Sequence, residues 1–289
     1  MFETLKNVFR VKEMRRKLLY LIWMIFIIRI GCQIPVPGVD SDFFKQWFSS
    51  NAGDAFNFFD AFTGGSFERM SIFALNITPY ITSSIIIQLL TIAIPALEEM
   101  QRDGEEGRKK MTAITRYVTV GLALFESIAM AIGFGRQGMI PNLDFFKGVV
   151  VVACLTAGSA MLMWLGERIT EKGVGNGISI VLTINIISRV PSDLTLLYEN
   201  FIKGKTIAKG TLAGLIIAAV ILLVVVLVLI LNGAERRIPV QYSKKMVGRK
   251  LMGGQSTNIP LKVNTAGVIP VIFASSIMSF PAVIAQLTG

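Results

Sequence analysis

The sequence predicts an all-α, polytopic membrane protein. Its 289 residues are 53% hydrophobic and only 17% charged, whereas soluble domains carry about 25% charged residues. Several stretches are almost free of charge and long enough to cross a bilayer core about 30 Å thick as helices. Histidine is absent, which excludes Ser/His and Cys/His nucleophile pairs, HExxH zinc sites and histidine-ligated haem.

Seven stretches are apolar enough to be membrane spans. The predicted spans are residues 18–35, 71–96, 113–134, 148–166, 177–191, 211–232 and 265–287. The first is not read as a cleaved signal peptide, because no small-residue cleavage site follows it and it ends in the rigid turn 35–38.

The basic residues predict the orientation of these spans. Most of the 29 Lys and Arg lie in the N-terminal tail and in the loops after the second, fourth and sixth spans. Cytoplasmic loops carry such an excess, so the N-terminus is predicted to be cytoplasmic. Ribosomal RNA remains open as a partner of these loops.

One aromatic segment fits neither a span nor an ordinary loop. Residues 56–70 contain five Phe but are too short to cross a bilayer, and Gly64-Gly65 separates most of them from the second span. We expect a short re-entrant helix on the outer side. Irregular backbone at membrane depth is tolerated only where protein or a water-filled cavity surrounds it. An amphipathic helix on the outer leaflet is the alternative.

The second and seventh predicted spans share a motif. Residues 79–85 read PYITSSI and residues 270–277 read PVIFASSI, each shortly after Asn76 or Asn264. The two spans run in opposite directions, which gives an inverted repeat of the kind common in transport proteins. A chance match of small residues is the alternative. A complete second copy would extend well beyond residue 289, so we expect a truncated chain.

The second span also carries a polar stripe beside a row of isoleucines. The polar positions are Asn76, Tyr80, Ser83 or Ser84, Gln88 and Thr91, and the isoleucines are Ile77, Ile81 and Ile85. Small polar residues of this kind hold packed helices together. The alternative is a water-filled passage that the isoleucines close by dewetting.

The remaining sequence features do not indicate a reactive site. Cys32 and Cys154 lie in apolar runs without metal-type spacing and are read as inert thiols. The run GVGNGIS (173–179) lacks the Gly-Lys-Ser/Thr ending of a phosphate loop and predicts a tight turn. Arg29 and Glu126 lie inside spans, where function, helix pairing and snorkelling are all open. No paired carboxylates are visible, so neither an enzyme nor a cofactor is expected.

Four runs resemble the bacterial SecY family of protein-conducting channels. They are RIGCQIPVPGVD (29–40), SIFALNITPYITSSIIIQLL (71–90), WLGERITEKGVGNGISIVL (164–182) and QSTNIPLKVNTAGVIPVIFASSIMSFP (255–281). The resemblance implies the SecY inverted-repeat channel fold, which has ten spans in two halves of five, and this chain would hold the first seven. Residues 1–197 would be the N-terminal half, and residues 198–289 the start of the C-terminal half.

The resemblance also implies roles for individual residues. The implied pore ring consists of Ile77, Ile81, Ile178, Leu182 and Ile272, with Leu182 in place of the commoner Ile. The implied plug is the helix 56–70, with Phe56, Phe58, Phe59, Phe62, Gly64, Gly65 and Phe67. The implied lateral gate has Thr82 facing Phe280. In the cytoplasmic loop 233–264 the implied docking residues are Arg236, Arg237, Lys244, Lys245, Arg249 and Lys250.

The function implied by the resemblance is that of a central channel subunit. It would pass unfolded secretory proteins across the cytoplasmic membrane and membrane proteins into it. The implied partners are SecE, SecG, the SecA ATPase, the ribosome, signal sequences, nascent chains and lipid. A secondary transporter of small solutes is the alternative, but it would need polar groups converging at mid-membrane, where this sequence has isoleucines. A non-conducting membrane scaffold is a third possibility.

Overall fold

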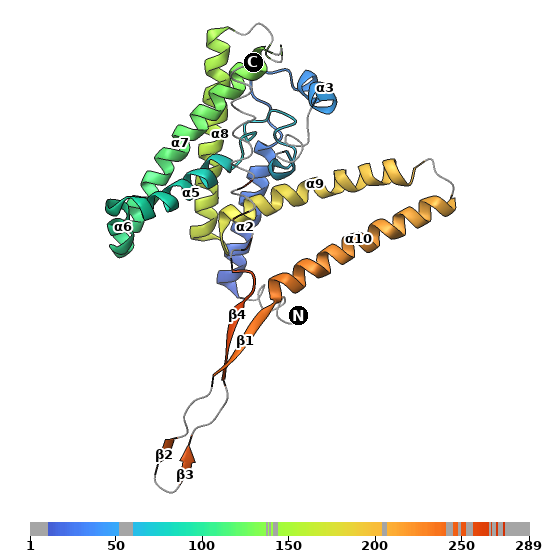
Figure 1. Ribbon diagram of the computed structural model, residues 1–289. Coiled ribbons are helices and arrows are strands. Elements are labelled where there is room, and N and C mark those ends of the chain that lie inside the picture. The colour runs from blue at the N-terminus through green and yellow to red at the C-terminus, as the bar shows by residue number, and fades with distance from the viewer. Residues whose placement is uncertain are drawn as a thin grey trace. The chain divides into compact units, whose positions relative to one another are not determined.

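The computed structural model describes residues 11–51, 60–136, 138, 140, 144–203, 207–240, 245–247, 250–252, 257–265, 267, 270 and 274. The chain divides into two compact units, one of residues 1–192 with 272–289 and the other of residues 193–271. The helices of the described residues are α2 (Lys12–Gly31), α3 (Ser41–Asn51), α5 (Thr78–Ala93), α6 (Pro95–Arg102), α7 (Gly104–Arg136), α8 (Phe145–Lys172), α9 (Gly177–Phe201) and α10 (Ile207–Gly233) (Figure 1).

The first unit is built around the long helices α7 and α8, which pack side by side (Figure 1). Helix α5 packs on α7, and α2 contacts α8. The chain before α5 also approaches α8 closely, because a side chain at Gly158 would overlap the carbonyl oxygen of Ile72. Glycine at this position therefore lets the two backbones meet.

Residues 60–77, which precede α5, are mostly irregular and yet largely buried. Residues 60–63 form one helical turn, and turns with a single bridge residue follow from 64 to 77. Two predictions are wrong here. The short helix predicted for 56–70 does not continue beyond Thr63, and the second span does not begin at residue 71. Asn76 has a φ of 53°, which a right-handed helix cannot contain, and α5 begins only at Thr78.

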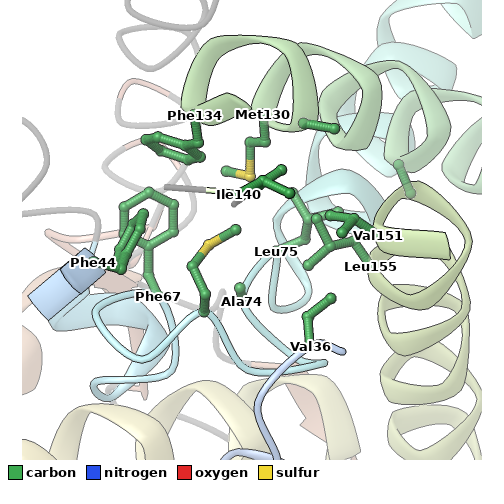
Figure 2. Close-up of a cluster of buried hydrophobic side chains, with 13 residues drawn as sticks. Val36, Phe44, Phe67, Ala74, Leu75, Met130, Phe134, Ile140, Val151 and Leu155 are labelled. Carbon is green, nitrogen blue, oxygen red and sulfur yellow. The ribbon is translucent and has the colours of Figure 1, made fainter. Parts of the chain in front are cut away.

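A cluster of apolar side chains holds this irregular segment in place (Figure 2). The rings of Phe44, Phe67 and Phe134 meet edge to face, with centroids 5.0 to 6.1 Å apart. This is a favoured aromatic geometry, and it joins α3, the segment 60–77 and α7. Leu155 of α8 completes another side of the cluster.

The second predicted span is bent at its end. Helix α5 stops at Ala93, and α6 starts at Pro95 with its axis turned by 104°. Proline lacks a backbone donor and forces the residue before it into an extended conformation, which Ile94 adopts with φ −113° and ψ 111°. Helix α5 therefore ends three residues before the predicted end of the span at residue 96.

Four described helices are long and apolar enough to cross a membrane, namely α7, α8, α9 and α10, and the bent pair α5 and α6 gives up to five. Helix α2 occupies most of the first predicted span. The predicted end of the fifth span at 191 is wrong, because α9 continues through Pro191 to Phe201. The seventh predicted span lies almost wholly outside the described residues.

The second unit contains α10 and a β ribbon. Between Thr211 and Gly233, α10 has no charged residue and no buried one. After it, β1 (Glu235–Val240) pairs antiparallel with β4 (Thr257–Lys262), with Glu235 opposite Lys262, and β2 (Lys245–Val247) pairs with β3 (Lys250–Met252) (Figure 1).

Sequence analysis missed this ribbon, for which it expected only a loop. Pro239 in β1 and Pro260 in β4 argue against strands at first sight. A two-stranded ribbon has a free edge on each strand, however, and proline is tolerated at edges.

Candidate functional site

Three of the five predicted ring residues gather in one hydrophobic cluster. Ile77 is fully buried in it, and Ile81 and Ile178 pack against it partly buried. Ile77 is the last residue before α5, and Ile81 lies one turn into that helix, so both are on the same side of α5. Ile178 comes from the first turn of α9.

The cluster is assembled from α2, α5, α8, α9 and the turn before α5. Its other buried members are Ile28, Cys32, Phe73, Leu162, Leu165, Ile169 and Val181. Helices α8 and α9 approach closely here, because a Cβ at Gly166 would lie 3.1 Å from Cγ1 of Ile178. Branched aliphatic side chains have no hydrogen-bonding groups, so a constriction made of them can exclude water and ions.

The other predicted ring and gate residues are placed as follows. Leu182 lies one turn beyond Ile178 on α9, is half-buried and is not among the members of the cluster. Thr82 is buried in α5, and its hydroxyl donates to the carbonyl of Thr78 at 3.0 Å. Ile272 and Phe280 lie outside the described residues.

The predicted plug residues are described in part. Phe67 lies in the aromatic cluster of Figure 2. Phe62 is half-buried, and Gly64 and Gly65 have φ angles of 68° and 80°, which glycine adopts without strain. Phe56, Phe58 and Phe59 lie outside the described residues.

A buried polar network joins the segment 60–77 to α9. Asn185 Nδ2 donates to Asn76 Oδ1 at 3.1 Å, and Arg29 Nη1 donates to Asn185 Oδ1 at 3.3 Å. Asn76 also donates through Nδ2 to the backbone carbonyl of Phe62 at 2.9 Å. Its own backbone carbonyl accepts from the hydroxyl of Ser159 at 3.3 Å. Arg29, whose role inside a span was left open, therefore has a partner.

A second polar contact lies at Asp60, whose side chain is fully buried. Its Oδ2 forms an ion pair with Arg189 of α9. Its Oδ1 accepts from the backbone N–H of Glu68 at 3.0 Å and from the hydroxyl of Thr63 at 3.1 Å. A buried carboxylate requires this degree of satisfaction, because an unpaired charge away from water is costly.

Sequence analysis did not single out Asp60, Asn185 or Arg189. A signal was present for two of them, since Asn185 and Arg189 interrupt the apolar run of α9 four residues apart, one helical turn, and therefore on one face. Ionisable or amide side chains within spans usually face protein or a cavity, and here both face the segment 60–77.

The polar stripe of α5 is satisfied largely within the helix. Ser83 and Thr91 are buried and donate to the carbonyls of Pro79 and Ile87, each at 2.7 Å. Gln88 is exposed. These contacts favour helix packing as the role of Ser83 and Thr91, which was one of the two readings left open by the sequence.

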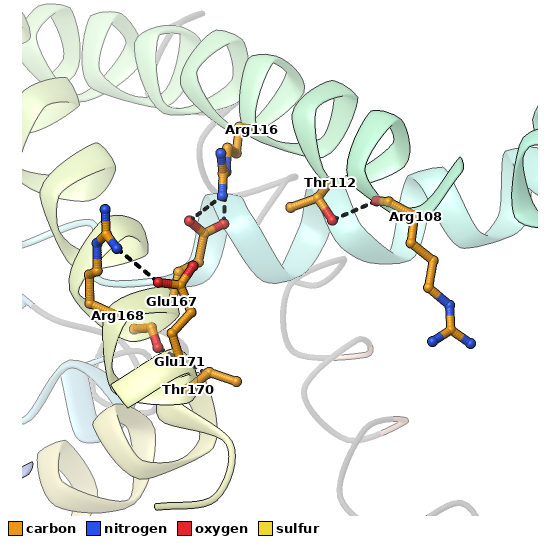
Figure 3. A network of polar contacts seen from close by, with 8 residues as sticks. Arg108, Thr112, Arg116, Glu167, Arg168, Thr170 and Glu171 are labelled. Carbon is orange, nitrogen blue, oxygen red and sulfur yellow. Dashed lines mark hydrogen bonds and ion pairs between the residues drawn. The ribbon is translucent and has the colours of Figure 1, made fainter. Parts of the chain in front are cut away.

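A cluster of charged side chains lies between α7 and α8 (Figure 3). Arg116 of α7 binds Glu167 of α8 through two nitrogen–oxygen contacts of 2.9 and 2.8 Å, and Arg168 pairs with Glu171 at 2.8 Å. Thr170 accepts at its hydroxyl from the backbone N–H of Gly177 at 2.9 Å. This bond closes the glycine-rich segment after α8, which forms the predicted tight turn.

Four of the six predicted docking residues are described, and these four belong to the β ribbon. Arg236 and Arg237 are exposed on β1, opposite Leu261 and Pro260. Lys245 begins β2 and Lys250 begins β3. Lys244 and Arg249 lie outside the described residues.

Among the described residues, no group of His, Cys, Asp and Glu could hold a metal ion. Cys32 is buried, Cys154 is half-buried, and both are free thiols.

Comparison with known proteins agrees with this architecture. The SecY family profile matches residues 71–289. The chain is 44% identical to the protein translocase subunit SecY of Halalkalibacterium halodurans, over 100% of this chain and 68% of the relative. It is 43% identical to that of Escherichia coli K12, over 96% of this chain and 63% of the relative.

Solved structures show the same fold. A protein-conducting channel superposes with a TM-score of 0.63 at 18% identity, covering 94% of this chain and 58% of that one. Sec61 from a canine ribosome–channel complex gives a TM-score of 0.59 with 94% and 59% covered. The predicted helical channel fold is therefore confirmed, and the matches favour it over a small-solute transporter. The chain belongs to the SecY family of protein translocase subunits.

Proposed function

We propose that this chain forms the central part of a protein-conducting channel. It passes unfolded secretory proteins across the cell membrane and releases the spans of membrane proteins sideways into the lipid. The observation that carries the proposal is the cluster of Ile77, Ile81 and Ile178 in a chain of the SecY family. Leu182 and Ile272 complete the constriction in this proposal.

The constriction works because it is apolar and deformable. A channel for unfolded chains must accept every side chain, so it cannot rely on specific hydrogen bonds. Branched aliphatic side chains close against ions when the channel is empty and yield to a passing polypeptide. In the closed state Ile77 is covered on all sides, as its full burial indicates.

Sorting between secretion and insertion follows from partition into lipid. Each apolar residue gains about 0.3 to 0.6 kcal/mol at the centre of the bilayer, whereas a charged residue costs about 2.5 to 3.5 kcal/mol. We assign the side opening to Thr82 of α5 and Phe280 of the seventh predicted span. An apolar segment leaves there and a polar one continues through the channel.

We assign the plug to residues 56–70. The burial of Asp60, Thr63, Ser66, Phe67 and Met70 supports this, because a plug must pack against protein when it closes the outer mouth. A SecY structure with a TM-score of 0.59 to this chain was described as one in which the plug domain stabilises the closed state and maintains a membrane seal.

The orientation and partners are part of the same proposal. The N-terminus is cytoplasmic, and loop 233–264 docks the ribosome or SecA through its seven Lys and Arg. SecE and SecG bind the membrane-spanning part. The chain itself acts as a passage and not as an enzyme, so its partners supply the driving force.

The proposal is tested in proteoliposomes that contain the complete translocase. Ile77→Ser, Ile81→Ser and Ile178→Ser should each increase ion leak, because a hydroxyl hydrates the constriction. Ile92→Ser is the matched control, since Ile92 lies on the same helix as Ile81 and is 84% exposed. Unchanged leak in all three ring variants, or equal leak in the control, would contradict the proposal.

A further inference from the structure

The segment 60–77, which contains the described part of the proposed plug, contacts one face of α9 at three places. Asp60 pairs with Arg189, the backbone at Gly64 lies against Asn185, and Asn76 pairs with Asn185. Residues 185 and 189 are four apart and lie on the same side of the helix. The polar groups on this face of α9 thus meet the segment 60–77, and Asn185 also accepts a hydrogen bond from Arg29 of α2.

The contact between the backbone at Gly64 and α9 leaves almost no free space. A Cβ at Gly64 would lie 2.6 Å from the carbonyl oxygen of Asn185 and 2.9 Å from the hydroxyl of Ser188. That hydroxyl donates to the same carbonyl at 2.7 Å. The backbone of the segment is therefore seated directly on α9, between the ion pair and the amide pair.

Movement of the segment away from α9 would break these contacts. If the segment moves away, Asp60 loses its cation and Asn76 loses an amide partner, within a region where both side chains are now at most 1% exposed. Polar groups separated at such depth need new partners or water. The contacts therefore oppose small displacements and break together.

We propose that Asp60–Arg189 and Asn76–Asn185 form a latch that couples release of the plug to movement of α9. The inference rests on the proposed function. Helix α9 carries Ile178 in its first turn and the latch about two turns later. A passing chain that displaces Ile178 moves the helix on which the plug segment is seated, so the constriction and the plug open as one event. The four latch side chains are positioning residues.

The test combines hydrogen exchange with ion leak in the complete translocase. Asp60→Asn and Arg189→Gln each break the ion pair between the segment and α9, and each should speed amide exchange in residues 60–76 about tenfold or more and increase the leak. The double variant Asp60→Asn/Arg189→Gln restores an uncharged pair of hydrogen-bonding amides. It should return both readouts toward the wild-type values.

The ion pair between α7 and α8 provides the matched control. Arg116→Gln and Glu167→Gln remove a pair of the same chemistry away from the plug segment, and they should leave exchange in residues 60–76 unchanged. The same change in exchange for the control and latch variants would mean general loosening and would overturn the latch.

The experiment distinguishes a failure of the latch from a failure of the proposed channel function. If Asp60→Asn and Arg189→Gln leave exchange in residues 60–76 unchanged while the ring variants leak, the latch is wrong and the channel proposal stands. If exchange rises but neither the latch nor the ring variants change ion leak, the channel proposal itself is contradicted, and the gating role of the latch is overturned with it.

Discussion

Residues 60–77 and helix α10 both lie in or beside stretches that the sequence assigns to the membrane, and they differ in shape, chemistry and burial. The segment is mostly irregular and buries polar side chains, among them Asp60, Ser71 and Asn76. Helix α10 is regular and apolar on every side, and none of its residues from Thr211 to Gly233 is buried.

The difference follows from where the backbone hydrogen bonds go. A helix satisfies its own N–H and C=O groups and can therefore face lipid, whereas irregular backbone needs protein or water around it. The segment 60–77 obtains this cover from α2, α7, α8 and α9 through the two hydrophobic clusters and the polar network. The irregular backbone of this segment therefore requires a dedicated set of packing and hydrogen-bonding partners.

The largest effect on this difference is expected when the buried carboxylate of Asp60 is removed. Asp60→Ala leaves Arg189 without its carboxylate and should lower the free energy of unfolding by about 3 to 5 kcal/mol. Denaturant unfolding in detergent measures this. Glu171→Ala, which removes the exposed partner of Arg168, is the control and should cost less than about 1 kcal/mol. Equal losses would show that burial does not distinguish the two pairs.

A charge in α10 should have the next largest effect. Val224→Arg places a cation near the middle of an apolar span and should disfavour its insertion by about 2.5 to 3.5 kcal/mol. Protease protection of the flanking loops in membrane vesicles measures the inserted fraction. Val224→Leu keeps the surface apolar and should insert fully. Full insertion of the Arg variant would contradict a lipid-facing position.

The two glycines near the start of the irregular segment, Gly64 and Gly65, test whether close contact with α9 constrains its backbone. Gly64→Ala meets both a φ of 68° and the carbonyl of Asn185, so it should cost about 2 to 3 kcal/mol and increase ion leak. Gly65→Ala has a similar φ of 80° but nothing within 4 Å, and it should cost only about 1 to 2 kcal/mol. Thermal unfolding and leak are measured together. Identical effects would exclude close contact with α9 as the cause.

The smallest effects are expected in the loop 233–264, where Arg236 and Arg237 are exposed. Arg249→Glu with Lys250→Glu should weaken docking of the ribosome or SecA by about 1 kcal/mol for each charge at low salt, and less at high salt because exposed charges are screened. Binding titrations at two ionic strengths measure this. Equal binding at low salt would rule out these two residues as docking contacts.

Local pattern predicted the regular elements well. The apolar runs of α7, α8 and α10 were predicted as spans, and the glycine-rich turn before α9 was predicted from the missing phosphate-loop ending. Hydropathy misled at 71–77, because SIFALNI is as apolar as a helix that crosses the membrane. The left-handed Asn76 and the position of Pro79 in the first turn of α5 set the true start. The prolines of β1 and β4 concealed the ribbon, because proline within a run argues against a strand.

The sequence alone determined that this protein lies in a membrane, where its main apolar runs are and which family it resembles, because these properties depend on local hydropathy and on short motifs. The tertiary structure alone decided which polar residues meet. Asn185 pairs with Asn76 across 109 residues and with Arg29 across 156, and Asp60 meets Arg189 in the same way. Such pairs depend on which segments become neighbours when the unit folds. Local periodicity carries no information about that choice, because the burial that makes these pairs necessary exists only after packing.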